Sequence, residues 1–129
     1  MEKNEAMNPL DLAQTIVRIL DDKKAFSLKL LHVEKQTVLT DYFVICSGTS
    51  NTQIKSLCGE VEHKLSEKGV TPRGIEGYNE ASWIVLDYGS VIVHIFNRET
   101  RNYYNLEKLW ADSTDVDIKQ LLDTENEDK

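Results

Sequence analysis

The chain has 129 residues, of which 40% are hydrophobic and 29% are charged, and its formal net charge is −7. This length suits one domain whose core needs no disulfide or metal. No apolar run reaches the length of a membrane span, and residues 1–5 carry no signal sequence, so we expect a cytoplasmic protein. Residues 111–129 hold seven acidic and two basic side chains (−5), which leaves fifteen acidic and thirteen basic ones (−2) in residues 1–110, and this nearly neutral body argues against direct, sequence-specific nucleic-acid binding.

The beginning of the chain predicts a helix followed by two strands. Asn8 is a candidate N-cap with Pro9 at the first helical position. Apolar side chains follow with helical spacing, at Leu12, Ala13, Ile16, Val17 and Leu20. Residues 26–33 then read as a strand. Residues 41–47 form an apolar run of strand length, which is typical of a central strand in a sheet.

A second helix is predicted after that central strand. Ser50 and Gln53 fit a capping box at its start. Its apolar stripe comprises Ile54, Leu57, Cys58, Val61 and Leu65. Gly69 is placed to end the helix, and residues 73–77 are consistent with a short edge strand.

Two β-branched runs, residues 84–86 and 91–93, are joined by a short turn with a glycine, and this pattern predicts a β-hairpin. We expect a helix after it, with an apolar side that includes Tyr103, Leu106 and Leu109 or Trp110. This order of elements predicts an α/β (α+β) domain with a single mixed β-sheet covered by helices. We assign residues 1–113 to this domain and residues 114–129 to an acidic C-terminal tail, which we expect to be frayed.

The turn Gly48-Thr49-Ser50, between a strand and a helix, is the one enzyme-like feature. Such a helix N-terminus can bind phosphate, and nucleotidyltransferases add two carboxylates, two residues apart, to hold magnesium. The corresponding Glu60 and Glu62 point about 200° apart on a helix, so they cannot share one ion. We therefore interpret the turn as a cap and expect no catalytic residue. A nucleotide-binding enzyme or sensor of nucleotidyltransferase type is the alternative.

The histidines and cysteines predict neither a metal site nor a cofactor. No second histidine or cysteine lies at ligand spacing from His32, His63 or His94. We expect His63 to face solvent and His94 to be packed and hydrogen-bonded. Cys46 lies in an apolar strand and Cys58 on an apolar helix face, which favours buried, reduced thiols.

Aromatic side chains gather in residues 83–110. Tyrosine and tryptophan often dominate the energetics of protein interfaces. Trp110 ends an apolar helix stripe, which favours a place in the core. Trp83 and Tyr88 flank a strand entry and a hairpin tip, where burial is harder. We interpret both as contacts with a partner, with core packing as the alternative.

Five segments occur in a characteristic order: DYFVICSGTS at residues 41–50, Glu76-Gly77, WIVLDYG at residues 83–89, VIVH at residues 91–94, and YNLEKLW at residues 104–110. Together they closely resemble the ribosomal silencing factor family, also called Iojap-like, and the match runs from about residue 7 to residue 113. The resemblance implies a nucleotidyltransferase-like αβ fold that lacks the catalytic carboxylates.

The resemblance also implies a function and a set of contact residues. Members of the family form homodimers and bind ribosomal protein fourteen of the large subunit. There they block joining of the small subunit, which represses translation when nutrients are scarce. In this chain the contact residues would be Trp83, Asp87, Tyr88, Ser90 and Val91. The family commonly has Asp after the hairpin glycine where this chain has Ser90, so a charge-assisted contact with a basic ribosomal side chain would be lost or supplied elsewhere.

Overall fold

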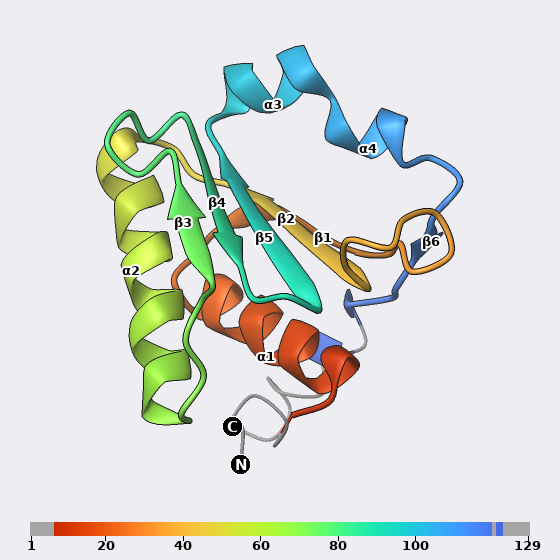
Figure 1. The fold of residues 1–129 in the computed structure, drawn as a ribbon. Helices are drawn as coiled ribbons and strands as arrows, with labels where there is room; N and C mark the ends of the chain where they lie inside the picture. Colours follow the sequence, from red (N-terminus) through yellow and green to blue (C-terminus); the bar gives the residue numbers. More distant parts are fainter. Residues whose placement is uncertain (1–6, 120, 123–129) are drawn as a thin grey trace.

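The computed structural model describes residues 7–119 and 121–122. Within them the elements, in chain order, are α1 (Pro9–Asp22), β1 (Phe26–His32), β2 (Tyr42–Ser47), α2 (Asn51–Glu67), β3 (Gly74–Glu76), β4 (Trp83–Asp87), β5 (Val91–Phe96), α3 (Arg98–Tyr104), α4 (Leu106–Leu109) and β6 (Thr114–Asp115). The strands form one sheet in the order β3-β4-β5-β2-β1-β6 (Figure 1). β2 and β5 pair in parallel and the other neighbours pair antiparallel, which confirms the predicted mixed sheet.

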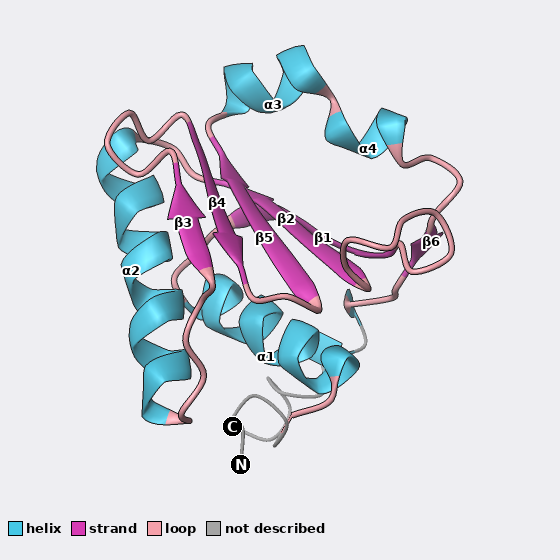
Figure 2. Cartoon of the chain, viewed as in Figure 1, coloured by secondary structure: helices cyan, strands magenta, loops and turns pink. Residues whose placement is uncertain are grey.

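Helices cover the two faces of the sheet unequally (Figure 2). The long helices α1 and α2 pack on one face, where they build the main core with side chains such as Val44, Ile84 and Ile95. A smaller buried cluster occupies the opposite face and consists of Leu31, Val33, Phe43, Ile45 and Phe96. Of the helices that the structure describes, only the short α3 and α4 stand over this second face. We call it the open face.

Side-chain caps set the ends of the two long helices. Asn8 accepts a hydrogen bond from the backbone N–H of Asp11 at 2.8 Å, and Ser50 accepts one from Gln53 at 3.1 Å. Both predicted N-caps are thereby confirmed. The capping box is only half formed, because the Gln53 side chain accepts hydrogen bonds from the N–H and hydroxyl of Thr49 instead of reaching back to Ser50.

The prediction of a single helix after the hairpin is wrong, because the chain forms two short helices, α3 and α4, that are separated at Asn105. This residue has a left-handed conformation (φ 49°) and caps α3 with its backbone N–H on the carbonyl of Arg101. Asn adopts this conformation more readily than most residues. The break turns the next residues, so Leu106 packs on the open face while Tyr103 and Leu109 remain 81% and 73% exposed.

Part of the segment predicted as a frayed tail is ordered on the sheet. Thr114–Asp115 forms β6 and pairs with β1, and the N–H of Val116 donates to the carbonyl of Leu30 at 2.8 Å. Four apolar side chains then pack against the main core, namely Val116, Ile118, Leu121 and Leu122. The prediction of a frayed tail relied on its many acidic residues and overlooked these apolar side chains. Residues 1–6 and 123–129, on which part of the predictions fell, lie outside the described residues.

Candidate functional site

Trp83 lies on the open face, where neighbouring side chains fix its orientation. Its indole Nε1–H donates a hydrogen bond to Nδ1 of His94 at 3.1 Å. Its ring stacks on Phe96 with centroids 4.9 Å apart, and Tyr104 from α3 contacts it at the same separation. The tryptophan nevertheless remains half-buried, so part of the ring is open to solvent. A pre-oriented, partly exposed aromatic ring is well suited to anchor a protein partner.

His94 is buried beside this tryptophan, which confirms the prediction of a packed, hydrogen-bonded histidine. Burial lowers the pKa of its imidazole from the ordinary value to about 4, so the ring is neutral near pH 7. Because Nδ1 accepts the hydrogen of Trp83, we assign the proton to Nε2. That Nε2 is buried and has no hydrogen-bond partner among the described residues. Histidine therefore acts here as an acceptor that orients the indole.

Tyr88 and Val91 lie on the other side of the sheet. The side chain of Tyr88 is 4% exposed and Val91 is fully buried, and both belong to the main core under α1 and α2. The expectation that Tyr88 is hard to bury at the hairpin tip is therefore wrong. Tyr88 lies an odd number of residues after Trp83, and alternation along an extended chain places such positions on opposite faces. Burial also raises the pKa of its phenol far above the usual value.

Asp87 and Ser90 build the turn of the hairpin. The Asp87 carboxylate accepts a hydrogen bond from the N–H of Gly89 at 2.8 Å. The carbonyl of Ser90 accepts from the N–H groups of Asp41 and Tyr42 at 3.0 and 3.1 Å. Both side chains are half-buried. The turn lies four residues beyond Trp83, or about 13 Å along a strand, so the five predicted residues do not form one continuous patch.

The surface around Trp83 includes side chains that the sequence reasoning did not single out as contacts. Val85 and Ile92 share the open face with it and are partly exposed, and Tyr104 is 50% exposed. The signal for the first two was present in the sequence, because alternation from Trp83 reaches Val85 and alternation from His94 reaches Ile92. Nothing local in the sequence predicted that α3 would carry Tyr104 against Trp83.

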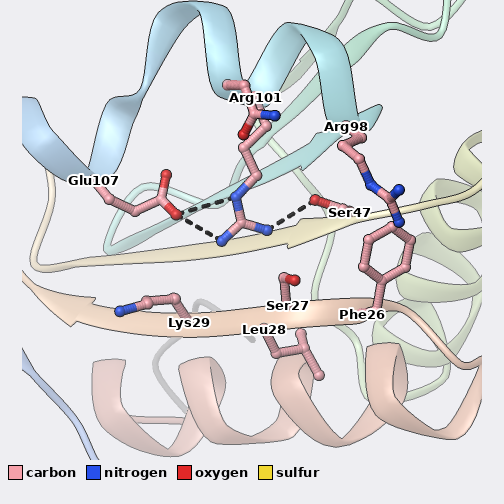
Figure 3. Close-up of a pocket in the computed structure, with 9 residues that line it drawn as sticks. Phe26, Ser27, Leu28, Lys29, Ser47, Arg98, Arg101 and Glu107 are labelled. Carbon is pink, nitrogen blue, oxygen red and sulfur yellow. Dashed lines mark hydrogen bonds and ion pairs between the residues drawn. The ribbon is translucent and has the colours of Figure 1, made fainter.

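A partly buried ion pair attaches α3 and α4 to the sheet (Figure 3). The guanidinium of Arg101 donates from Nε and Nη2 to Glu107 at 3.1 and 2.8 Å, and from Nη1 to the hydroxyl of Ser47 in β2 at 2.8 Å. Burial raises the pKa of the Glu107 carboxyl, but the hydrogen bond and charge of Arg101, together with a backbone hydrogen bond and the charge of Lys29, outweigh burial, so its net pKa lies below the usual value. This contact holds α3, and with it Tyr104, in place over the open face.

The Gly48-Thr49-Ser50 turn uses its polar groups within the protein. The N–H of Gly48 donates to the carbonyl of Phe96, and both donors of Thr49 bond to the side chain of Gln53. A cavity of about 440 Å³ borders the turn, but the donors of Gly48 and Thr49 already have partners within the protein. Glu60 and Glu62 lie on α2, as the sequence predicted.

Thiol and metal chemistry find little support in the part of the chain that the structure describes. Cys46 and Cys58 are free and buried, and burial raises their pKa values to about 12 and about 11. Both thiols therefore stay protonated near pH 7. His63 is exposed beside Glu67, as expected. No cluster of three or more candidate metal ligands occurs among the described residues. None of the helices described is long and apolar enough to cross a membrane.

Comparisons with known proteins agree with this fold and with the motifs. The family model for the ribosomal silencing factor during starvation matches residues 6–129. The ribosomal silencing factor RsfS of Halalkalibacterium halodurans is 36% identical over 116 residues, which cover 90% of this chain and 99% of that protein. The Bacillus subtilis protein of the same name is 37% identical over 112 residues, or 87% and 95% of the two chains. A solved structure from Chromobacterium violaceum has a TM-score of 0.79 and 33% identity, covering 81% of this chain and 88% of that one. The chain therefore belongs to the ribosomal silencing factor family.

Proposed function

We propose that this chain binds the large ribosomal subunit through ribosomal protein fourteen, prevents the small subunit from joining, and so represses translation when nutrients are scarce. Membership of the ribosomal silencing factor family supports ribosome association and translational control. The nearly neutral body supports docking on a protein surface, since binding to the RNA backbone would favour a basic stripe. In this role the chain acts as a steric block and needs no catalytic residue.

The observation that carries the docking proposal is the partly exposed, pre-oriented Trp83 on the open face. We propose Trp83 and Tyr104 as the aromatic anchors, with Asp87 and Ser90 as polar contacts at the hairpin turn. Tyr88, which is buried under α1 and α2, supports the hairpin from behind. Val91 has the same supporting position.

Sedimentation through sucrose gradients tests this function directly. The protein should co-sediment with isolated large subunits and only weakly with joined ribosomes. It should also inhibit subunit joining in a reconstituted assay. Equal recovery in both fractions, or recovery in neither, would contradict the steric mechanism. Sedimentation velocity of the protein alone tests the homodimer that the family resemblance implies.

Substitutions then test the docking surface. Truncating a central aromatic anchor typically costs about 2 kcal/mol, or roughly thirtyfold in affinity. We expect Trp83→Ala and Tyr104→Ala to weaken binding to ribosomal protein fourteen by this order. Tyr78→Ala is the matched control, because Tyr78 is similarly exposed but lies against Lys55 on α2. Ser90→Asp should hold or improve binding if a basic side chain of the partner lies near the turn.

The alternative, a nucleotide-binding protein of nucleotidyltransferase type, has weaker support because the donors of Gly48 and Thr49 are used internally. Glu60 and Glu62 also lie two residues apart on the helix α2, where they point away from each other. Calorimetry with nucleotides and magnesium detects binding, and a transfer assay with labelled nucleotide distinguishes the two functions. Transfer of labelled nucleotide that is abolished by Glu60→Ala or Glu62→Ala would favour the enzyme and overturn our proposal.

A further inference from the structure

A cavity of about 480 Å³ lies between the start of β1 and the helices α3 and α4. Three of the side chains that line it are cationic (Lys29, Arg98 and Arg101) and one is a carboxylate (Glu107), which gives a local charge of 3 − 1 = +2. The chain as a whole has a net charge of −7, so this local excess of positive charge is unusual for the protein. Its volume lies in the range of small-molecule sites, which is about 300–1,000 Å³.

Hydrogen-bond donors in this cavity remain available for a ligand. A guanidinium has five N–H donors, and three hydrogen bonds of Arg101 go to Glu107 and Ser47, which leaves one N–H on each terminal nitrogen. The guanidinium of Arg98 lies over the ring of Phe26 at 5.4 Å, and among the described residues it has no carboxylate within ion-pair distance. Lys29 lies 3.6 Å from Asp115, but both side chains are largely exposed, so this pair is weak.

The backbone of β1 is distorted at this cavity. Its pairing with β2 shifts register between Phe26 and Lys29, and Ser27 has a left-handed conformation with φ 52°. Such a conformation costs a residue with a side chain about 1–2 kcal/mol, and bulges of this kind redirect side chains beside functional sites. In Figure 3 the Ser27 side chain points from β1 toward the space into which Arg101 projects from α3. The distortion thus brings a hydroxyl to the cationic groups.

We propose that this cavity binds a small molecule that carries a phosphate group. Its donors come from three elements, since β1 supplies Ser27 and Lys29, β2 supplies Ser47, and α3 supplies Arg98 and Arg101. Donors converging from several sides suit a tetrahedral phosphate better than a planar carboxylate, and arginine is a preferred phosphate ligand. A phosphate dianion would also balance the local charge of +2. The remaining volume would hold the organic part of the ligand.

NMR titration of the full chain with inorganic phosphate and with adenosine monophosphate tests the site, with sodium chloride at matched ionic strength as the reference. We expect saturable shifts of amides near Ser27, Ser47 and Arg98. Arg98→Gln and Lys29→Gln should weaken binding at least tenfold. Their controls, Arg73→Gln and Lys64→Gln, remove charges that do not line the cavity and should leave binding unchanged.

Ser27→Gly separates ligand binding from folding. Glycine adopts the left-handed conformation without strain, so this variant should melt no lower than the wild type while its affinity for phosphate falls. Shifts that sodium chloride reproduces, or equal losses in the control variants, would overturn the site. Tighter binding of a short RNA oligonucleotide than of adenosine monophosphate would overturn the small-molecule ligand. None of these measurements uses ribosomes, so their failure would leave the proposed docking function untouched.

Discussion

Replacing Tyr88 tests whether the hairpin tip is core or docking surface. Its ring is buried in the main core, and its hydroxyl is buried without a hydrogen-bond partner among the described residues. Truncating a buried aromatic side chain to alanine costs about 3–5 kcal/mol. We expect Tyr88→Ala to lose stability of this order, which corresponds to a fall in Tm of roughly 10–20 °C for a domain of this size.

Tyr88→Phe isolates the hydroxyl from the ring. A buried hydroxyl without a partner costs about 1–3 kcal/mol, so removing it should leave stability unchanged or raise it by about 1 kcal/mol. The ring, and therefore the packing, is retained. Since the ring faces α2 and not the open face, this variant should bind large ribosomal subunits as well as the wild type.

Urea unfolding followed by tryptophan fluorescence measures both variants, with Tyr78→Ala as the exposed control. Substitution of an exposed tyrosine should change the free energy of unfolding by less than about 0.5 kcal/mol. A Tyr88→Ala protein that unfolds like the wild type and yet fails to bind large subunits would refute the reasoning. Such a result would restore Tyr88 to the docking surface. A large loss of stability in Tyr88→Phe would mean that the hydroxyl has a partner.

Three further substitutions test how the open face is built. Gly77→Ala should destabilise the fold by more than about 1 kcal/mol in urea unfolding, because Gly77 has φ 82° and a Cβ there would collide with the carbonyl oxygen of Trp83. In the folded protein the pKa of His94 lies near 4, below the value of about 6.5 in the unfolded chain. The stability that the neutral imidazole contributes is therefore complete above pH 6.5, and it falls by about 2 kcal/mol between pH 7 and pH 5. His94→Gln should flatten this pH profile of the free energy of unfolding. Arg101→Met should lower the free energy of unfolding in urea by about 2–3 kcal/mol, because it leaves the partly buried carboxylate of Glu107 without its partner. Removing one partner of a fully buried ion pair costs about 3–5 kcal/mol, and partial burial reduces this cost.

Elements with strong local signals were predictable from the sequence. The caps Asn8 and Ser50 and the helical spacing of apolar residues define α1 and α2, and the Gly89 turn between β-branched runs defines the hairpin. These signals depend on neighbours within a few residues, so one sequence is enough to interpret them. The same holds for His94, whose place on an apolar strand favoured a packed ring over a metal ligand.

Features that depend on distant parts of the chain were not predictable. The parallel pairing of β2 with β5 joins segments about fifty residues apart in sequence. Parallel strands need a long connection, which here runs through α2, β3 and β4. Asn105 can adopt a left-handed conformation, but the apolar spacing around it continues a helical pattern. The break is favoured because Arg101 reaches both Ser47 and Glu107 only when α4 turns back over the sheet. The Ser27 bulge has only a weak local signal, which is the imperfect alternation of apolar and polar residues over residues 28–31.

For the candidate site, too, local sequence patterns predicted one part and contacts between distant segments decided the rest. Alternation alone separates Trp83 and Val85 from Tyr88, so the two aromatic residues of the hairpin could have been assigned to opposite faces from the sequence. Which of these faces is open could not, because that depends on where α1 and α2 pack. Once the helices cover the Tyr88 face, the indole of Trp83 is left with His94, Phe96 and a single short helix. The exposure that makes Trp83 a candidate anchor is therefore a consequence of helix placement and not of its position at a strand entry.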